Sequence, residues 1–96
     1  MANRIQGTVV EVNGAGDLIT DIVEEKWVGI KRTFETKIVV DDEHETFGLF
    51  DSNHQQPPMT LIAIVESNRP LRLHLVADSA SAMLGVSKGA KVEILW

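Results

Sequence analysis

The last third of the chain reads Met59-Thr-Leu-Ile-Ala-Ile-Val65, Glu66-Ser-Asn-Arg69, Pro70, Leu71-Arg-Leu-His-Leu75, Val76-Ala-Asp78, Ser79-Ala-Ser-Ala-Met-Leu-Gly-Val86 and Ser87-Lys-Gly-Ala-Lys-Val-Glu-Ile-Leu-Trp96. Alternation in the segment 71–75 predicts a strand that turns its leucines inward and Arg72 and His74 toward solvent. Ser79 and Gly85 are typical of the two caps of a short helix over Ala80–Leu84. This stretch therefore predicts two strands, a helical turn and a closing strand over Lys91–Trp96.

The first two thirds of the chain add further short strands. Asn13-Gly14-Ala15-Gly16-Asp17 is a strong turn signal, because asparagine and glycine tolerate positive φ. It predicts a hairpin, and an acidic turn over Asp41–Glu45 closes the strand Thr36–Val40. The expected strands are Ile5–Val12, Leu18–Val23, Thr36–Val40 and Thr46–Phe50. The segment Glu24–Ile30 is ambiguous, and two acids at its start favour a short helix.

These elements predict one all-β domain over residues 1–96. We expect a small closed or nearly closed β-barrel of six to seven strands with one or two short helical turns, since closure removes exposed sheet edges. Nearly every residue of Met59–Val65 is apolar, so both faces of that strand need cover. The barrel interior covers one face. Either the Trp27 segment or a subunit contact covers the other.

Composition excludes several classes of function. A net charge of −5 and only five aromatic residues, Trp27, Phe34, Phe47, Phe50 and Trp96, argue against nucleic acid as a partner. No apolar run approaches the length of a membrane span, and the N-terminal residues lack a secretory core, so a cytoplasmic protein is expected. The absence of cysteine removes disulfides, thiolate metal sites and cysteine nucleophiles.

No catalytic or metal-binding residue is predicted from the side chains. The acidic turn Asp41–Glu45 lacks the ligand spacing of a calcium loop, and a solvated turn is the better interpretation. The three histidines, His44, His54 and His74, form no two-histidine motif at helical spacing. Ser67 has no evident histidine and aspartate partners in the sequence, so a ligand-binding hydroxyl is favoured over a nucleophile.

Four motifs in a fixed order resemble one known domain. They are Gly7-Thr-Val-Val-Glu-Val12, Ala15-Gly-Asp-Leu-Ile-Thr-Asp-Ile22, Ser67 after the apolar strand, and Asp78-Ser-Ala-Ser-Ala-Met-Leu-Gly-Val86 with Lys88-Gly-Ala-Lys-Val92. Together they resemble the C-terminal barrel domain of the S-adenosylmethionine hydroxide adenosyltransferase family, which includes chlorinases and fluorinases. The resemblance covers roughly Gly7 to Leu95, and the catalytic N-terminal domain of that family has no counterpart in this sequence.

The resemblance implies a ligand site and an assembly. In the family this domain packs against the N-terminal domain of a neighbouring subunit in a trimer and supplies the adenine and methionine side of the pocket. The positions that match the family's ligand contacts are Asp17, Asp21, Ser67, Asn68, Val76, Ala77 and Phe50, with Phe47 as the alternative to Phe50. Asp17 replaces an asparagine and, when ionised, can only accept hydrogen bonds. Ala15 replaces an aromatic residue, so the ancestral pocket is expected to be altered.

The sequence therefore predicts a non-catalytic binding or assembly module. On this hypothesis the chain is a homo-oligomer with a residual nucleoside or S-adenosylmethionine-like site at a subunit interface. It needs no cofactor for chemistry, and S-adenosylmethionine or adenosine is the expected ligand. One alternative is half of a split S-adenosylmethionine hydrolase whose catalytic domain is a separate chain. Another is a purely structural oligomerisation domain.

Overall fold

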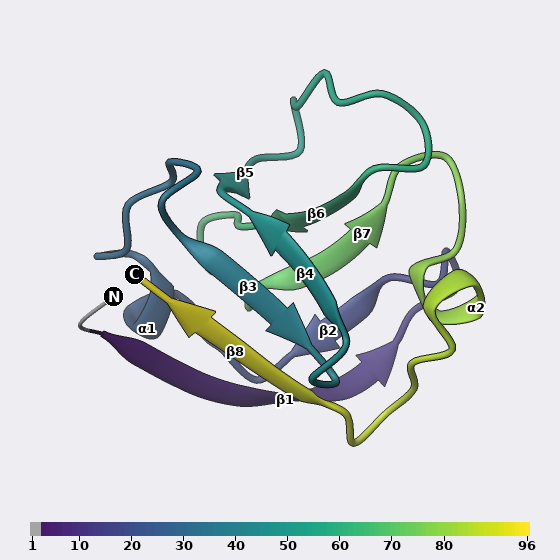
Figure 1. Ribbon diagram of the computed structural model, residues 1–96, viewed down its shortest axis with the longest axis horizontal. Coiled ribbons are helices and arrows are strands. Elements are labelled where there is room, and N and C mark those ends of the chain that lie inside the picture. Colours follow the sequence, from purple (N-terminus) through teal and green to yellow (C-terminus); the bar gives the residue numbers. More distant parts are fainter. Residues whose placement is uncertain (1–2) are drawn as a thin grey trace.

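The structure is a computed structural model that describes residues 3–96 and contains eight strands and two short helices (Figure 1). In chain order these elements are β1 (Arg4–Val12), β2 (Leu18–Thr20), α1 (Glu24–Trp27), β3 (Lys37–Val40), β4 (His44–Phe47), β5 (Leu49–Phe50), β6 (Leu61–Ile64), β7 (Arg72–Leu75), α2 (Ala80–Leu84) and β8 (Lys91–Leu95). Neither helix exceeds five residues, and no helix within residues 3–96 is long and apolar enough to cross a membrane.

The strands form one curved sheet in the order β4-β3-β8-β1-β2-β7-β6-β5. All neighbours are antiparallel except β5 and β6, which are parallel. The sheet bends until β4 lies beside β6, which confirms the predicted nearly closed barrel (Figure 1). The strand count is eight rather than six to seven, partly because Gly48, at φ +84°, separates β4 from β5 where one strand was expected.

Side chains close the seam between β4 and β6. The ladder between β3 and β4 ends where the Gly48 N–H donates to the Thr36 carbonyl. As in any antiparallel pair, the N–H and C=O groups of every second residue of β4 point away from β3. In the described part of the chain no backbone ladder joins β4 to β6. Instead the Thr46 hydroxyl donates a 2.6 Å hydrogen bond to the Leu61 carbonyl. This bond joins β4 to the first residue of β6, and the chain continues from β4 into β5, whose backbone pairs with β6.

Replacing Thr46 with valine tests this closure. The Thr46→Val variant keeps the volume of the side chain but removes the donor, so the Leu61 carbonyl loses its partner. We expect the free energy of unfolding to fall by about 1–2 kcal/mol, the usual cost of an unpaired buried acceptor. Urea denaturation followed by tryptophan fluorescence, from buried Trp27 and from Trp96, measures it. An unchanged midpoint would mean that apolar packing alone closes the seam.

The barrel interior holds one apolar cluster to which most of the strands contribute. Its fully buried side chains include Leu18, Ile38, Leu73, Val92 and Ile94. Trp27 of α1 joins the cluster and donates a 3.1 Å hydrogen bond from Nε1 to the Arg69 carbonyl. This bond ties α1 to the turn between β6 and β7, where the candidate site lies.

A loop of the same chain covers the outer face of β6. Ile62 and Ile64 are 1% and 2% exposed and lie outside the interior cluster. They stand opposite His74 and Arg72 of β7, so these four side chains share the outer face. The 51–58 loop lies over it, since the ring of His54 is 6.0 Å from that of His74. Neither predicted cover was right, because Trp27 packs inside the barrel and burial needs no second subunit.

The locally encoded elements follow the sequence closely. The helix over Ala80–Leu84 is confirmed, with the Ser79 hydroxyl accepting from the Ala82 N–H and Gly85 in the left-handed conformation. The 24–30 segment contributes the short helix α1. The acidic segment forms the turn between β3 and β4, although its last two residues, His44 and Glu45, already belong to β4.

Candidate functional site

The turn between β6 and β7 presents two hydrogen-bond donors to one carboxylate. Asn68 has φ +64°, and the Arg69 N–H donates to the Glu66 carbonyl at 3.1 Å, so the chain reverses tightly here. In this conformation the Ser67 hydroxyl donates to Glu24 Oε2 at 3.3 Å and the Asn68 N–H donates to Glu24 Oε1 at 3.2 Å. A hydroxyl and a backbone N–H that converge on the two oxygens of one carboxylate form a small anion receptor.

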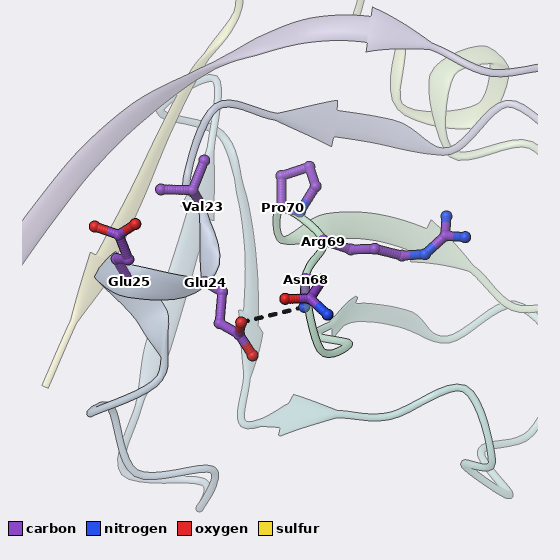
Figure 2. Close-up of a pocket in the computed structure, with 6 residues that line it drawn as sticks. All are labelled: Val23, Glu24, Glu25, Asn68, Arg69 and Pro70. Carbon is purple, nitrogen blue, oxygen red and sulfur yellow. Dashed lines mark hydrogen bonds between the residues drawn. The ribbon is translucent and has the colours of Figure 1, made fainter.

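A shallow cleft adjoins this receptor. Its volume is about 240 Å³, and its lining residues are Val23, Glu24, Glu25, Asn68, Arg69 and Pro70. Figure 2 shows the Glu24 carboxylate pointing across the cleft to Asn68, whereas the Glu25 side chain points away from that turn. Arg69 also extends away from Glu24, so the turn itself supplies the donors that Glu24 uses.

Backbone contacts hold both walls of the cleft in place. The Leu71 N–H donates to the Ile22 carbonyl at 2.9 Å, which fixes the residues before α1 against the start of β7. The bond from Trp27 Nε1 to the Arg69 carbonyl fixes α1 against the turn. The site is therefore built on anchored segments, although Ser67 and Asn68 themselves are exposed.

Other residues named as ligand contacts from the sequence are used by the fold. Asp21 accepts a 2.8 Å bond from the Thr8 N–H through Oδ1 and so extends the β1–β2 pairing. The Val76 N–H donates to the Thr60 carbonyl, and the Val76 carbonyl accepts from the Met59 N–H. Ala77 follows β7 in an exposed turn at φ +65°. Phe50 packs its ring edge-on against Phe34, with ring centroids 6.3 Å apart.

Asp17 lies in a charged cluster on the outer face of the barrel. Its side chain is 8% exposed, and Oδ1 accepts a 2.7 Å hydrogen bond from His74 Nδ1. Oδ2 lies 3.5 Å from Nε of Arg72, whose guanidinium also pairs with Glu66. The prediction that Arg72 and His74 point out of the barrel is correct, but they meet Asp17 and Glu66 there rather than bulk solvent. Asp17 therefore has little capacity left for a ligand.

The predicted ligand residues consequently fall at two ends of the β2–β7 pair. Asp17, Val76 and Ala77 lie at one end, because Leu18 pairs with Leu73 just before β7 ends. Asp21 and the Ser67–Asn68 turn lie at the other. At the usual rise per residue of a β-strand, the Cα atoms of Asp17 and Asp21 lie about 13 Å apart. Among the residues named from the sequence, only Asn68 lines the cleft, and Ser67 lies next to it through its bond to Glu24.

The acidic turn shows no sign of a cation site. Asp42 pairs with Lys91 at 2.9 Å, and this hydrogen bond, with a smaller contribution from Glu93, raises the pKa of the Lys91 ammonium above its ordinary value. Among residues 3–96, no group of three or more histidine, aspartate or glutamate side chains is placed to hold a metal ion.

Sequence reasoning missed Glu24, the partner of the Ser67–Asn68 turn. It is separated from that turn by more than forty residues, and nothing in its local pattern marks it. The cluster around Asp17 was missed for the same reason, since His74 is 57 residues away. The local signals at Glu24 indicated only the start of a helix.

The comparisons with known proteins identify the fold. The structure is similar to an uncharacterized conserved protein from Thermotoga maritima, with a TM-score of 0.76 and 21% identity over 100% of this chain and 38% of that one. It is also similar to a conserved hypothetical protein from Thermus thermophilus, with a TM-score of 0.70 and 19% identity over 94% of this chain and 34% of that one.

At such low identity the likeness establishes a shared fold alone. No protein-family model matches the chain. No curated protein matches it in sequence either. This chain spans little more than a third of the length of the two solved proteins, in which the same barrel is joined to further polypeptide.

Proposed function

We propose that this chain is a non-catalytic binding module for a small molecule that carries a carboxylate, with S-adenosylmethionine as the leading candidate. The observation that carries the proposal is the pair of donors on the Ser67–Asn68 turn, which hold a carboxylate at the mouth of a cleft. A ligand carboxylate would take the place that Glu24 occupies. The rest of the ligand would then lie along the cleft beside Val23 and Pro70.

The resemblance to the C-terminal domain of the S-adenosylmethionine hydroxide adenosyltransferases supports the same ligand class. It puts the methionine end of the ligand at Ser67, where the carboxylate receptor lies. The adenine end is less well supported, because Asp17 is buried and bonded to His74 and Arg72. We therefore propose that the amino-acid end of the ligand, rather than the base, makes the principal polar contacts.

Titration calorimetry with three ligands tests this proposal. S-adenosylmethionine carries both ends, whereas methionine and adenosine carry one each. We expect heat from S-adenosylmethionine and from methionine, and weaker heat or none from adenosine. Adenosine binding as tightly as S-adenosylmethionine would show that the carboxylate is not the anchor. No heat from any of the three up to millimolar concentrations would overturn the proposal. The mass in solution, measured alongside, tests the alternative of a structural oligomerisation domain.

Removing the internal carboxylate should strengthen binding. In Glu24→Ala the Ser67 hydroxyl and the Asn68 N–H no longer have to release Glu24, and one negative charge leaves the cleft. We expect the affinity for S-adenosylmethionine to rise by roughly three- to tenfold, since a competing closed state lowers apparent affinity in proportion to its population. Calorimetry measures this change directly.

Glu25→Ala is the matched control for that variant. It removes the same charge from the same helix, but the Glu25 side chain points away from the turn (Figure 2). Because Glu25 also lines the cleft, we expect a gain in affinity smaller than that of Glu24→Ala, which frees the two donors as well. Equal gains in the two variants would mean that net charge, not the receptor, governs binding. Ser67→Ala should act in the opposite direction and weaken binding about tenfold, because a bond to a charged group is lost.

A further inference from the structure

The tip of the β1–β2 hairpin holds the side-chain amide of Asn13 against its own backbone. Asn13 Oδ1 accepts two hydrogen bonds, from the Ala15 N–H and from the Asp17 N–H, each at 3.0 Å. The Gly16 N–H donates to the Asn13 carbonyl at 3.0 Å, so residues 13–16 form a tight turn. The ring that the Ala15 bond closes contains both Cγ of Asn13 and the backbone nitrogen of Gly14. The turn therefore holds these two atoms in one compact arrangement.

The backbone nitrogen of Gly14 is free to react. Gly14 is exposed, and no atom of residues 3–96 lies within 4 Å of the place that a Cβ would take there. Within the same residues its N–H donates to no acceptor. Hydroxide can therefore remove this proton without breaking a hydrogen bond of the fold. The absence of a side chain on Gly14 also leaves the approach of its nitrogen to the Asn13 side chain unhindered.

The two N–H groups on Asn13 Oδ1 lie where negative charge would develop in such a reaction. Attack of the Gly14 nitrogen on Cγ converts the amide oxygen into an oxyanion. Fixed donors at about 2.7–3.1 Å stabilise an oxygen of this kind. Both donors here are backbone groups at 3.0 Å. The turn thus supplies the side chain of its own first residue with the arrangement of an oxyanion hole.

We propose that Asn13 is a site of spontaneous deamidation, through a cyclic imide formed with Gly14. The Gly14 nitrogen forms a bond to Cγ, and the bond from Cγ to Nδ2 breaks. The proton that the Gly14 nitrogen loses is matched by the one that the departing nitrogen gains as it leaves as ammonia. Water then opens the imide, at Cγ to give aspartate or at the backbone carbonyl to give isoaspartate. The net change is the uptake of one water and the loss of one ammonia.

The two products have different effects on the hairpin. Aspartate keeps an oxygen that accepts from the Ala15 and Asp17 N–H groups. Isoaspartate carries the main chain through the former side chain, which lengthens it by one carbon and removes this acceptor. Asp17 bears the buried carboxylate that His74 binds, so isoaspartate is expected to disturb that contact. The inference is independent of the proposed ligand, because no residue of the Ser67–Asn68 turn takes part.

Storage of the folded protein for several weeks at mildly alkaline pH tests this inference, with peptide mass spectrometry that separates aspartate from isoaspartate. Asn53 and Asn68 are internal controls, because the N–H of the residue after each of them donates to a backbone carbonyl. We expect Asn13 to convert first. Gly14→Ala should slow its conversion about tenfold, since a side chain crowds the closure of the imide. No conversion at Asn13, or equally fast conversion at Asn53, would overturn the inference.

Arg69→Gly separates the effect of the turn from that of the residue pair. This variant gives Asn68 a following glycine, but the N–H at position 69 is bonded to the Glu66 carbonyl at 3.1 Å. In the folded variant we expect Asn68 to convert about tenfold more slowly than Asn13, because its neighbouring nitrogen is engaged. In urea, where neither turn persists, the two rates should become equal. Equal rates in the folded variant would mean that the pair of residues alone governs the reaction, which contradicts the role given to the turn.

Discussion

Replacing Gly16 with alanine should strongly destabilise the protein, although it adds a single methyl group. A Cβ at this position would lie 2.0 Å from the Ser79 Oγ, 2.6 Å from the Ser79 Cβ and 2.9 Å from the Ser79 Cα. The backbone also has φ +86° here, which costs a side-chain-bearing residue about 1–2 kcal/mol. Since a backbone atom is among those overlapped, no simple rotation of a side chain relieves the contact.

The overlap would also damage the start of α2. Ser79 caps this helix, and the Ser81 N–H donates to the Gly16 carbonyl at 2.9 Å. Displacing Ser79 therefore weakens the cap, which by itself contributes about 0.5–2 kcal/mol. We expect a total loss of roughly 3 kcal/mol or more, against a stability of about 5–10 kcal/mol for a domain of this size. Chemical denaturation monitored by tryptophan fluorescence measures it.

Gly14→Ala is the control for this prediction. Gly14 lies in the same turn, but no atom of residues 3–96 comes within 4 Å of the place that a Cβ would take there, and its φ is not positive. Alanine there should change the free energy of unfolding by less than about 1 kcal/mol, through the entropy of the unfolded chain. If both variants cost the same, the close approach of Gly16 to Ser79 is not a real feature of the fold.

The sequence predicts the parts of this fold that local chemistry encodes. The caps of α2, the alternation of β7 and the turn after Val12 each depend on residues within a few positions of one another, and the structure confirms each of them. The two-residue strand β5 was not separated from β4, because the sequence shows Gly48 but not its positive φ. Local pattern thus predicts the elements better than the breaks between them.

The candidate site depends on contacts that no local pattern encodes. Glu24 reaches Ser67 only because α1 is held against the β6–β7 turn, and that arrangement follows from the burial of Trp27. Likewise, the alternation of β7 predicted the direction of His74 correctly but not the buried carboxylate beside it. The direction of a side chain follows from the strand period, whereas its partner follows from the packing of the whole barrel.

The second large effect is expected at Asp17. Removing this carboxylate leaves His74 without the acceptor of its Nδ1 proton and takes away the charge 3.5 Å from the buried Nε of Arg72, whose guanidinium keeps its pair with Glu66. Breaking a buried charged pair by removing one partner costs about 3–5 kcal/mol. We expect Asp17→Ala to reach only the lower end of this range, because Arg72 keeps Glu66 and both Arg72 and His74 are partly exposed. Asp17→Asn should lose less, because its amide oxygen still accepts from His74. Urea denaturation of the two variants beside the unchanged protein measures both losses.

Asp78→Ala provides the comparison for a carboxylate that lies on the surface. Asp78 is exposed, and its carboxylate accepts from the neighbouring Ser79 N–H, so its removal should cost less than about 1 kcal/mol. The contrast matters for the ligand experiments. Loss of binding in Asp17→Ala would reflect unfolding as readily as a lost contact, so Ser67→Ala and Glu24→Ala are the informative variants there.

A double-mutant cycle isolates the contact between Asp17 and His74. Denaturation of Asp17→Ala, His74→Ala and the double variant gives the coupling between the two side chains, free of the other effects of each substitution. For a direct hydrogen bond of 2.7 Å between largely buried groups we expect about 1–3 kcal/mol. Strictly additive losses would mean that the two side chains are stabilised independently, Asp17 by Arg72 and His74 by the 51–58 loop. A measured coupling would instead mean that the hydrogen bond itself stabilises the β2–β7 pair, since it joins the residue before β2 to the outer face of β7.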